Sequence, residues 1–158
     1  MSEPTKRIVK IDLDERTVVR RNPDVEHERA VALFDLLEEN HFACTDIDGP
    51  YHLYLGIEEN RLVFDIRGNA GEAEPARIVL PITTFRSVVK DYFTICESYY
   101  AAIKRSSPTQ IEALDMGRRA IHNEGSELLR ERLEGKIALD LNTARRLFTL
   151  ICVLHIRG

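Results

Sequence analysis

The segment Asp115–Leu129, DMGRRAIHNEGSELL, brings charged and polar side chains together at helical spacing. Residues three or four apart lie on the same side of an α-helix, so Asp115, Arg119 and His122 are expected to share one flank, with Ser126 one turn further along. An imidazole beside guanidinium and carboxylate groups could act as a general acid or base, or could help to hold an anion. The candidate catalytic residues are His122, Arg119 and Glu124, and the candidate ligand-binding residues are Arg118, Arg119, His122, Asn123 and Ser126.

The same segment also allows a purely structural interpretation. His122 could hydrogen-bond to a neighbouring helix, and Arg118, which lies closer to the apolar stripe, could pair with an acid such as Glu97 or Glu124. A binding site would leave His122 and Arg119 partly exposed in a concave pocket. A structural network would instead bury them in mutual hydrogen bonds.

Other site chemistries find less support in the sequence. Ser126 has neither a glycine-framed elbow nor an obvious oxyanion hole, so no nucleophile is indicated. Asp24 with His27, and Glu38 with His41, have the acid-x-x-histidine spacing of metal ligands, but about four turns of one helix separate the two pairs. No HxxxH or CxxC motif accompanies them. We therefore expect no metal site and no cofactor.

Length and composition predict one globular domain, residues 1–158. The chain has 44% hydrophobic and 30% charged residues, with no low-complexity tract. The net charge of −4 makes nucleic acid an improbable partner. Residues 1–79 hold 10 Lys and Arg against 17 Asp and Glu, whereas residues 80–158 hold 12 against 9, so an anion site is expected in the second half.

The cysteines and the apolar segments predict a cytoplasmic protein without a membrane span. Cys44, Cys96 and Cys152 lack the short spacing of redox or zinc sites, and buried thiols fit a reducing cytosol. The N-terminus MSEPTKRIVK has no apolar core of a signal peptide. The densest apolar run, Leu147–Leu154, is far shorter than the ~20 residues that cross a bilayer.

The first half of the chain predicts strands around one helix. Alternation over Val9–Leu13 indicates a half-buried strand, with Thr17–Val19 as a hairpin partner. Asn22 and Pro23 indicate the start of a helix that ends near Asn40. Its apolar face is expected to comprise Val25, Ala30, Val31, Phe34, Leu36 and Leu37.

A hairpin follows, and its register can be predicted. A two-residue turn at Glu59 and Asn60 makes every inward pair apolar, whereas a slip by one residue would turn both faces over. A further strand is expected over Ile78–Ile82. The predicted inward pairs are Ile57 with Leu62, Leu55 with Phe64 and Leu53 with Ile66, and the outward pairs are Tyr54 with Asp65 and His52 with Arg67.

The second half predicts three helices. The first carries a continuous apolar stripe from Phe85 to Ile103, and Ser107 with Pro108 begins the second. Gly117 and Gly125 lie on the inner face of this second helix and indicate either a close approach by another backbone or a break within HNEG. The apolar face of the second helix is expected to contain Ile111, Leu114, Ile121 and Leu128.

The last helix is expected to begin at Asp140 or Asn142. It is apolar on every side over Leu147–Leu154, so it needs partners all round: the other helices, the sheet or a second copy of the chain. A strand over this β-branched run is the alternative. The fold class is thus α+β, an antiparallel sheet of four to five strands from the N-terminal half packed with about four helices.

Four segments of the chain together resemble one known family: VEHERAVALFDLLEEN, DYFTICESYY, DMGRRAIHNEGSELL and TARRLFTLICVLH. They cover the domain nearly from end to end. On them the chain is identified as a member of an uncharacterised family of small cytoplasmic proteins of alphaproteobacteria. The resemblance implies a bacterial cytosolic setting and a single domain, but it implies no activity and supplies no site residues.

Two functional hypotheses remain. The first is a non-enzymatic interaction or regulatory module, either a homo-oligomer formed through the apolar helices or the partner of an unknown protein. The second is a small enzyme, or an anion- or nucleotide-binding protein, that uses the arginine and histidine cluster of DMGRRAIHNEGSE. Whether the chain is an enzyme stays open, because no catalytic signature is present.

Overall fold

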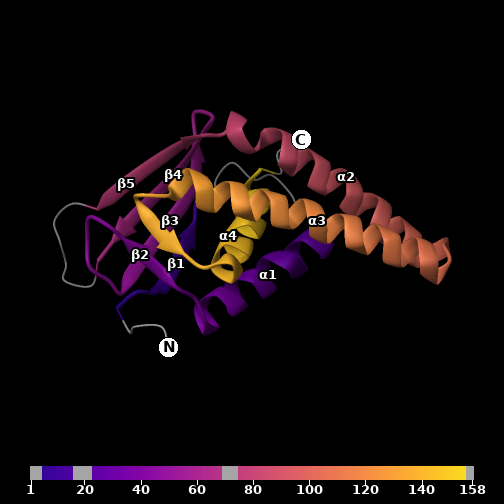
Figure 1. The fold of residues 1–158 in the computed structure, drawn as a ribbon, viewed down its shortest axis with the longest axis horizontal. Helices are drawn as coiled ribbons and strands as arrows, with labels where there is room; N and C mark the ends of the chain where they lie inside the picture. The colour runs from indigo at the N-terminus through magenta and orange to yellow at the C-terminus, as the bar shows by residue number, and fades with distance from the viewer. Residues whose placement is uncertain (1–4, 16–22, 69–74, 156–158) are drawn as a thin grey trace.

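The computed structural model describes residues 5–15, 23–68 and 75–155, and its fold is α+β as predicted. A sheet lies at one end of the molecule, and two long helices run from it to the other end as an antiparallel pair (Figure 1). In chain order the elements are β1 Ile8–Leu13, α1 Pro23–Glu38, β2 Phe42–Cys44, β3 Tyr51–Glu58, β4 Arg61–Arg67, β5 Ala76–Pro81, α2 Thr83–Arg105, α3 Pro108–Leu133, β6 Ile137–Leu139 and α4 Leu141–Leu154.

The main sheet has the strand order β1-β3-β4-β5. The predicted hairpin register is confirmed in all five pairs, from Ile57 opposite Leu62 to His52 opposite Arg67. Its turn residues Glu59 and Asn60 have φ of 49° and 63°, the left-handed conformation that a two-residue turn matching the twist of the strands requires.

The prediction of a purely antiparallel sheet is wrong, because β1 pairs with β3 in parallel and the sheet is therefore mixed. Parallel neighbours need a crossover connection, and the chain between β1 and β3 includes α1, which can provide one. The predicted hairpin partner Thr17–Val19 lies outside the described residues. A second, two-stranded sheet of β2 and β6 joins the segment after α1 to the segment before α4, and three residues per strand are too few for the sequence pattern to reveal it.

The apolar face predicted for α1 is only partly correct. The helix begins at Pro23, its predicted cap Asn22 lies outside the described residues, and it buries Val25, Ala32 and Leu36. Residues two apart on a helix point to nearly opposite sides, so the burial of Leu36 turns Phe34 into solvent. The predicted face residues that are exposed instead are Ala30, Val31, Phe34 and Leu37, the last three at 42%, 66% and 36%.

The helices α2 and α3 form the long pair. Ser107 caps α3 by accepting a hydrogen bond from the Gln110 amide, as predicted, but Ile103 near the far end of the pair is half exposed. The helix α3 runs unbroken through HNEG, so the break, one of the two alternatives for its glycines, does not occur. Instead side chains approach both glycines: a Cβ on Gly117 would lie 2.6 Å from Ile95 Cδ1, and one on Gly125 would overlap the ring of Phe148.

The α4 helix is the most buried helix, and the strand alternative is wrong. Asp140 caps it by accepting from the Thr143 amide at 2.9 Å, and every residue of Leu150–Leu154 is buried. It packs between α1 and α3 (Figure 1). The apolar residues predicted for the inner face of α3, Ile111, Leu114, Ile121 and Leu128, are only half-buried, and Leu129 and Leu133 are its fully buried apolar residues. None of the helices in the described ranges combines the length and apolar character that crossing a membrane requires.

Candidate functional site

A cavity of about 350 Å³ opens where α1, α3 and α4 meet, and we call it the arginine cavity. Five of its residues come from α1, one from α2, and three each from α3 and α4. It therefore depends on segments that are distant in the sequence. Its lining residues are His27, Glu28, Val31, Ala32, Asp35, Tyr92, Arg118, Arg119, His122, Arg145, Arg146 and Thr149.

The arginine cavity contains three of the predicted site residues, Arg118, Arg119 and His122, and leaves out the other three. Asn123 and Glu124 are exposed on α3 away from the cavity lining. Ser126 is fully buried, and its hydroxyl donates to the backbone carbonyl of His122 at 2.7 Å. This is the local bond that serine makes inside helices, so the hydroxyl is engaged by the backbone.

The Arg118 guanidinium is the centre of a polar network. It donates to Asp115 at 2.6 Å, lies 3.8 Å from Glu28 Oε1, and its carbon sits 4.5 Å from the centre of the Tyr99 ring. The predicted partners Glu97 and Glu124 are therefore wrong: the acids are one turn away on α3 and across the cavity on α1. Glu28 could not be recognised from local spacing, because 90 residues separate it from Arg118.

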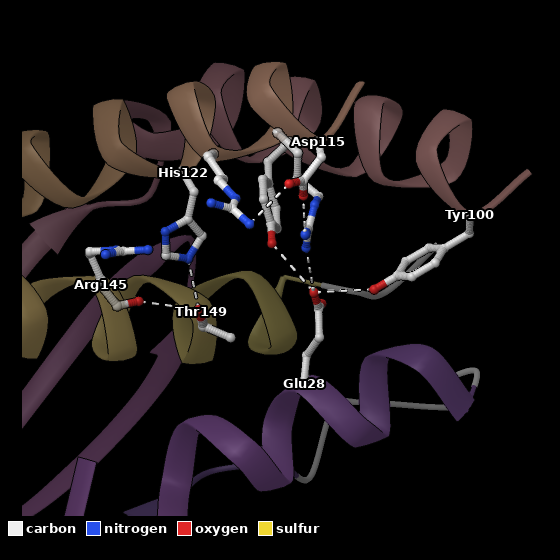
Figure 2. A network of polar contacts seen from close by, with 9 residues as sticks. Glu28, Tyr100, Asp115, His122, Arg145 and Thr149 are labelled. Atoms are coloured by element: carbon white, nitrogen blue, oxygen red, sulfur yellow. Dashed lines mark hydrogen bonds and ion pairs between the residues drawn. The ribbon is translucent and has the colours of Figure 1, made fainter. Parts of the chain in front are cut away.

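Glu28 joins this network through one carboxylate oxygen. Tyr92 and Tyr100 donate their hydroxyl hydrogens to Oε1 at 3.4 and 3.3 Å, the same oxygen that faces Arg118 (Figure 2). Burial raises the pKa of Glu28, and the charge of Arg118 opposes that rise. The hydrogen bond from Arg118 lowers the pKa of Asp115, so Asp115 stays ionised.

His122 is held by α4. Its Nε2 lies 2.8 Å from Thr149 Oγ1, and Thr149 donates its only hydroxyl hydrogen to the Arg145 carbonyl at 3.1 Å (Figure 2). Nε2 must therefore donate to Thr149, which leaves Nδ1 as an acceptor. Nδ1 is buried and has no hydrogen-bond partner among the described residues.

The environment of His122 keeps the ring neutral. Burial is the largest cause that lowers its pKa, the charges of Arg145, Arg118 and Arg146 act in the same direction, and together they bring the pKa to about 4. A neutral imidazole with so low a pKa holds no proton to give at neutral pH and is a weak base. General acid catalysis by His122 therefore has no support in this geometry.

Two arginines of α4 line the cavity, and sequence reasoning missed both. Arg146 lies 3.7 Å from Asp35 of α1. Within the described part of the chain, Arg145 makes no ion pair or side-chain hydrogen bond, and its Nε is buried without a partner. The adjacent pair in TARRLFT and the positive balance of the second half were the available signals.

The arginine cavity has an excess of positive charge. Four guanidinium groups line it, against the carboxylates of Glu28 and Asp35, with Asp115 bound to two of the arginines from behind. Such a cavity suits an anion. The described residues contain no group of three or more His, Cys, Asp or Glu side chains that could hold a metal ion.

Comparison with known proteins assigns the chain to a family. The model of the Uncharacterised protein family (UPF0262) matches residues 5–157. The chain belongs to this family. The UPF0262 protein amb3341 of Paramagnetospirillum magneticum is 64% identical over 154 residues, covering 97% of this chain and 98% of the relative.

Further members come from other alphaproteobacteria. The Rhodospirillum rubrum protein is 60% identical over 155 residues, 98% of this chain and 95% of that protein. The Caulobacter vibrioides protein is 60% identical over 153 residues, 96% of this chain and 94% of that protein. The resemblance that the four segments indicated is thus confirmed, and the family description assigns no activity. No solved structure matches the chain.

Proposed function

We propose that this protein is a non-enzymatic binding or regulatory module that holds a small organic anion in the arginine cavity. The observation that carries the proposal is the guanidinium of Arg145, which lines the cavity without a partner among the described residues. A buried donor without an acceptor is costly, so a site that leaves Arg145 Nε in this state is suited to a ligand that supplies an acceptor and the opposite charge.

The neighbouring groups favour the same ligand. A guanidinium presents a planar fork of donors that matches a carboxylate or a phosphate, and Arg146 is only loosely engaged by Asp35 at 3.7 Å. The cavity volume of about 350 Å³ lies at the lower end of the range for small-molecule sites, roughly 300–1,000 Å³. A small metabolite-sized anion fits this description better than a macromolecule does.

Binding without chemistry is the simpler role for these residues. His122 has its pKa lowered to about 4, and Ser126 gives its hydrogen to the helix backbone, so neither is prepared for acid catalysis or nucleophilic attack. We also propose the cytoplasm as the compartment. Its support is the three free, buried cysteines, which suit a reducing environment.

The test is calorimetric titration and thermal unfolding with ethyl phosphate and butyrate as probes. We expect at least one probe to bind the wild type and raise its Tm, and Arg145→Ala to lose both effects while its own unliganded Tm stays close to that of the wild type. Arg86→Ala is the matched control, because it removes an exposed arginine of α2 outside the cavity. If neither probe binds the wild type, or if Arg145→Ala binds as tightly, the proposal is wrong.

A second candidate function is self-association through α1. Val31, Phe34 and Leu37 are spaced three residues apart, so they form one exposed apolar stripe along the helix that begins at the arginine cavity, which Val31 also lines. In the described helices, α2, α3 and α4 each expose a single large apolar residue, Ile103, Met116 and Leu141, whereas α1 exposes three. Sedimentation of the wild type and of Phe34→Ser tests this candidate: a dimer that becomes a monomer supports it, and a monomeric wild type excludes it.

A further inference from the structure

We infer that the ligand of the arginine cavity is a zwitterion, whose anionic group lies against Arg145 and Arg146 and whose ammonium group lies against Glu28. This inference rests on the proposed function and specifies the substance that the cavity would take.

The wall contributed by α1 is acidic. Glu28 and Asp35 are seven residues apart, two turns of the helix, and both line the cavity. The arginines line it from α3 and α4. The cavity therefore has a positive side and a negative side. A simple anion would be repelled by the carboxylates, whereas a molecule with both charges would be attracted by both walls.

One of the two carboxylate oxygens of Glu28 is available to accept further hydrogen bonds. Its recorded contacts, with Tyr92, Tyr100 and Arg118, all converge on Oε1 at 3.3 to 3.8 Å. Oε2 makes no hydrogen bond or ion pair with any residue in the described ranges, although an ionised carboxylate oxygen accepts two hydrogen bonds. This oxygen is a free acceptor on a residue that lines the cavity.

An ammonium group suits this acceptor better than a neutral donor does. The distance of 3.8 Å from Arg118 to Oε1 exceeds the usual length of about 2.7–2.9 Å for a hydrogen bond between a charged nitrogen and a carboxylate, so Arg118 satisfies Glu28 incompletely. Hydrogen bonds with an ionised donor and acceptor are roughly twice as strong as neutral ones. A ligand ammonium on Oε2 would supply the charge that Arg118 supplies only from 3.8 Å.

The two ends of such a ligand are held apart by the fold. Glu28 and Arg145 lie on opposite sides of the polar network, with His122 and Thr149 between them (Figure 2). The ligand class is therefore an aminoalkyl phosphate or an amino acid with separated charges. The anion can be a phosphate or a carboxylate, because both match the guanidinium fork.

The experiment is calorimetric titration of the wild type with two matched pairs of probes. Phosphoethanolamine is compared with ethyl phosphate, and γ-aminobutyrate with butyrate, so that each pair differs mainly by the ammonium group. We expect the amino probe of at least one pair to bind about tenfold more tightly or better than its partner. The pair that shows this preference identifies the anionic group.

The variant Glu28→Gln should remove this preference. The amide keeps the shape of the side chain and an oxygen for the tyrosine hydroxyls, but it carries no charge, so the two members of each pair should then bind alike. Glu38→Gln, an exposed acid on the same helix outside the cavity, is the matched control and should keep the preference. The comparison of probes on the wild type stands even if Glu28→Gln fails to fold.

The outcomes separate this inference from the proposed function. If both members of each pair bind the wild type equally, the inference is overturned and the anion site stands. If the simple anions bind more tightly than the amino probes, the same conclusion holds. If no probe binds, the proposed function fails together with the inference.

Discussion

Asn40 and Glu28 both connect α1 to the rest of the protein, but their contacts differ in quality. Asn40 is 3% exposed, and it accepts from the Ile8 amide at 2.7 Å and donates to the carbonyls of Ile8 and Leu36 at 3.0 and 2.7 Å. Glu28 has only contacts of 3.3 to 3.8 Å to one of its oxygens. The hydrogen bonds of the Asn40 amide are complete, whereas the Glu28 carboxylate can accept a further partner.

This difference distinguishes a residue that stabilises the fold from residues that are available to bind a ligand. Asn40 uses both sides of its amide on the backbone of β1 and α1, so it fixes the helix against the sheet and leaves nothing for a ligand. Three residues of the arginine cavity have buried atoms without hydrogen-bond partners among the described residues: Arg118 Nε, Arg145 Nε and His122 Nδ1. Unsatisfied buried polar groups destabilise a fold, so a site that retains them indicates a use outside folding.

The largest effect is expected from Asn40→Leu. It removes the acceptor of the Ile8 amide and a donor to the carbonyls of Ile8 and Leu36, which should lower the free energy of unfolding by about 2–5 kcal/mol. Chemical denaturation measures this loss. Asn123→Leu, at an exposed position of α3, should stay within about 0.5 kcal/mol of the wild type. Equal effects of the two variants would show that Asn40 is not a structural contact.

The next effect is the pH dependence that His122 contributes. Its pKa is about 4 in the folded protein against 6.5 for a free histidine, so the unfolded chain binds this proton more readily. The stability it contributes is present above pH 6.5 and is lost as the pH falls towards 4, up to roughly 3 kcal/mol.

Denaturation from pH 8 to 4 checks this dependence. His122→Gln should flatten it, because glutamine can still donate to Thr149 but takes up no proton. His27→Gln, which removes an exposed histidine of α1 from the same cavity, is the control and should retain the acid sensitivity that His122 contributes. An unchanged profile in His122→Gln would place the acid sensitivity elsewhere.

A smaller loss is expected from Gly125→Ala, which tests the packing that shapes the cavity. The added methyl group would overlap the Phe148 ring and push α3 from α4, at a cost of about 1–3 kcal/mol. Gly117→Ala meets only the movable end of Ile95, so it should cost less or stabilise the helix. Thermal unfolding measures both losses of stability, and a larger loss for Gly117→Ala than for Gly125→Ala would contradict the packing described.

The smallest change in the free energy of unfolding is expected at Arg145, whose side chain makes no ion pair or hydrogen bond with described residues. Arg145→Met should change the unfolding free energy by no more than about 1 kcal/mol, in either direction, because no described partner loses a bond. Arg118→Met should cost about 1–3 kcal/mol, since it leaves Glu28 half-buried without its cation. A large loss in Arg145→Met would show that this arginine serves folding.

Local patterns predicted the local structure. Alternating apolar residues and one turn predicted the β3–β4 register, the cap at Ser107 marked the start of α3, and Asp140 was one of two candidate starts for α4. Each of these signals lies within a few residues of the feature it specifies. The sheet order, the short β2–β6 pair and the exposure of Phe34 depend on how distant elements pack, so they had no local signal.

For the same reason, the sequence predicted only the α3 side of the candidate site. The helical spacing in DMGRRAIHNEGSELL revealed the α3 side of the cavity, including Arg118, Arg119 and His122. Glu28 and Arg145 come from α1 and α4, and only packing brings them there. Arg119 also shows the limit of spacing, because it lines the cavity while its side chain stays 69% exposed.

The most direct measurement is heteronuclear NMR of the arginine side chains during titration with ethyl phosphate. We predict that the Nε–H signal of Arg145 shifts and exchanges more slowly with water, with a smaller shift for Arg146, while the exposed Arg86 does not respond. A titration in which Arg145 stays unchanged, or in which Arg86 responds equally, would contradict an anion site in the arginine cavity.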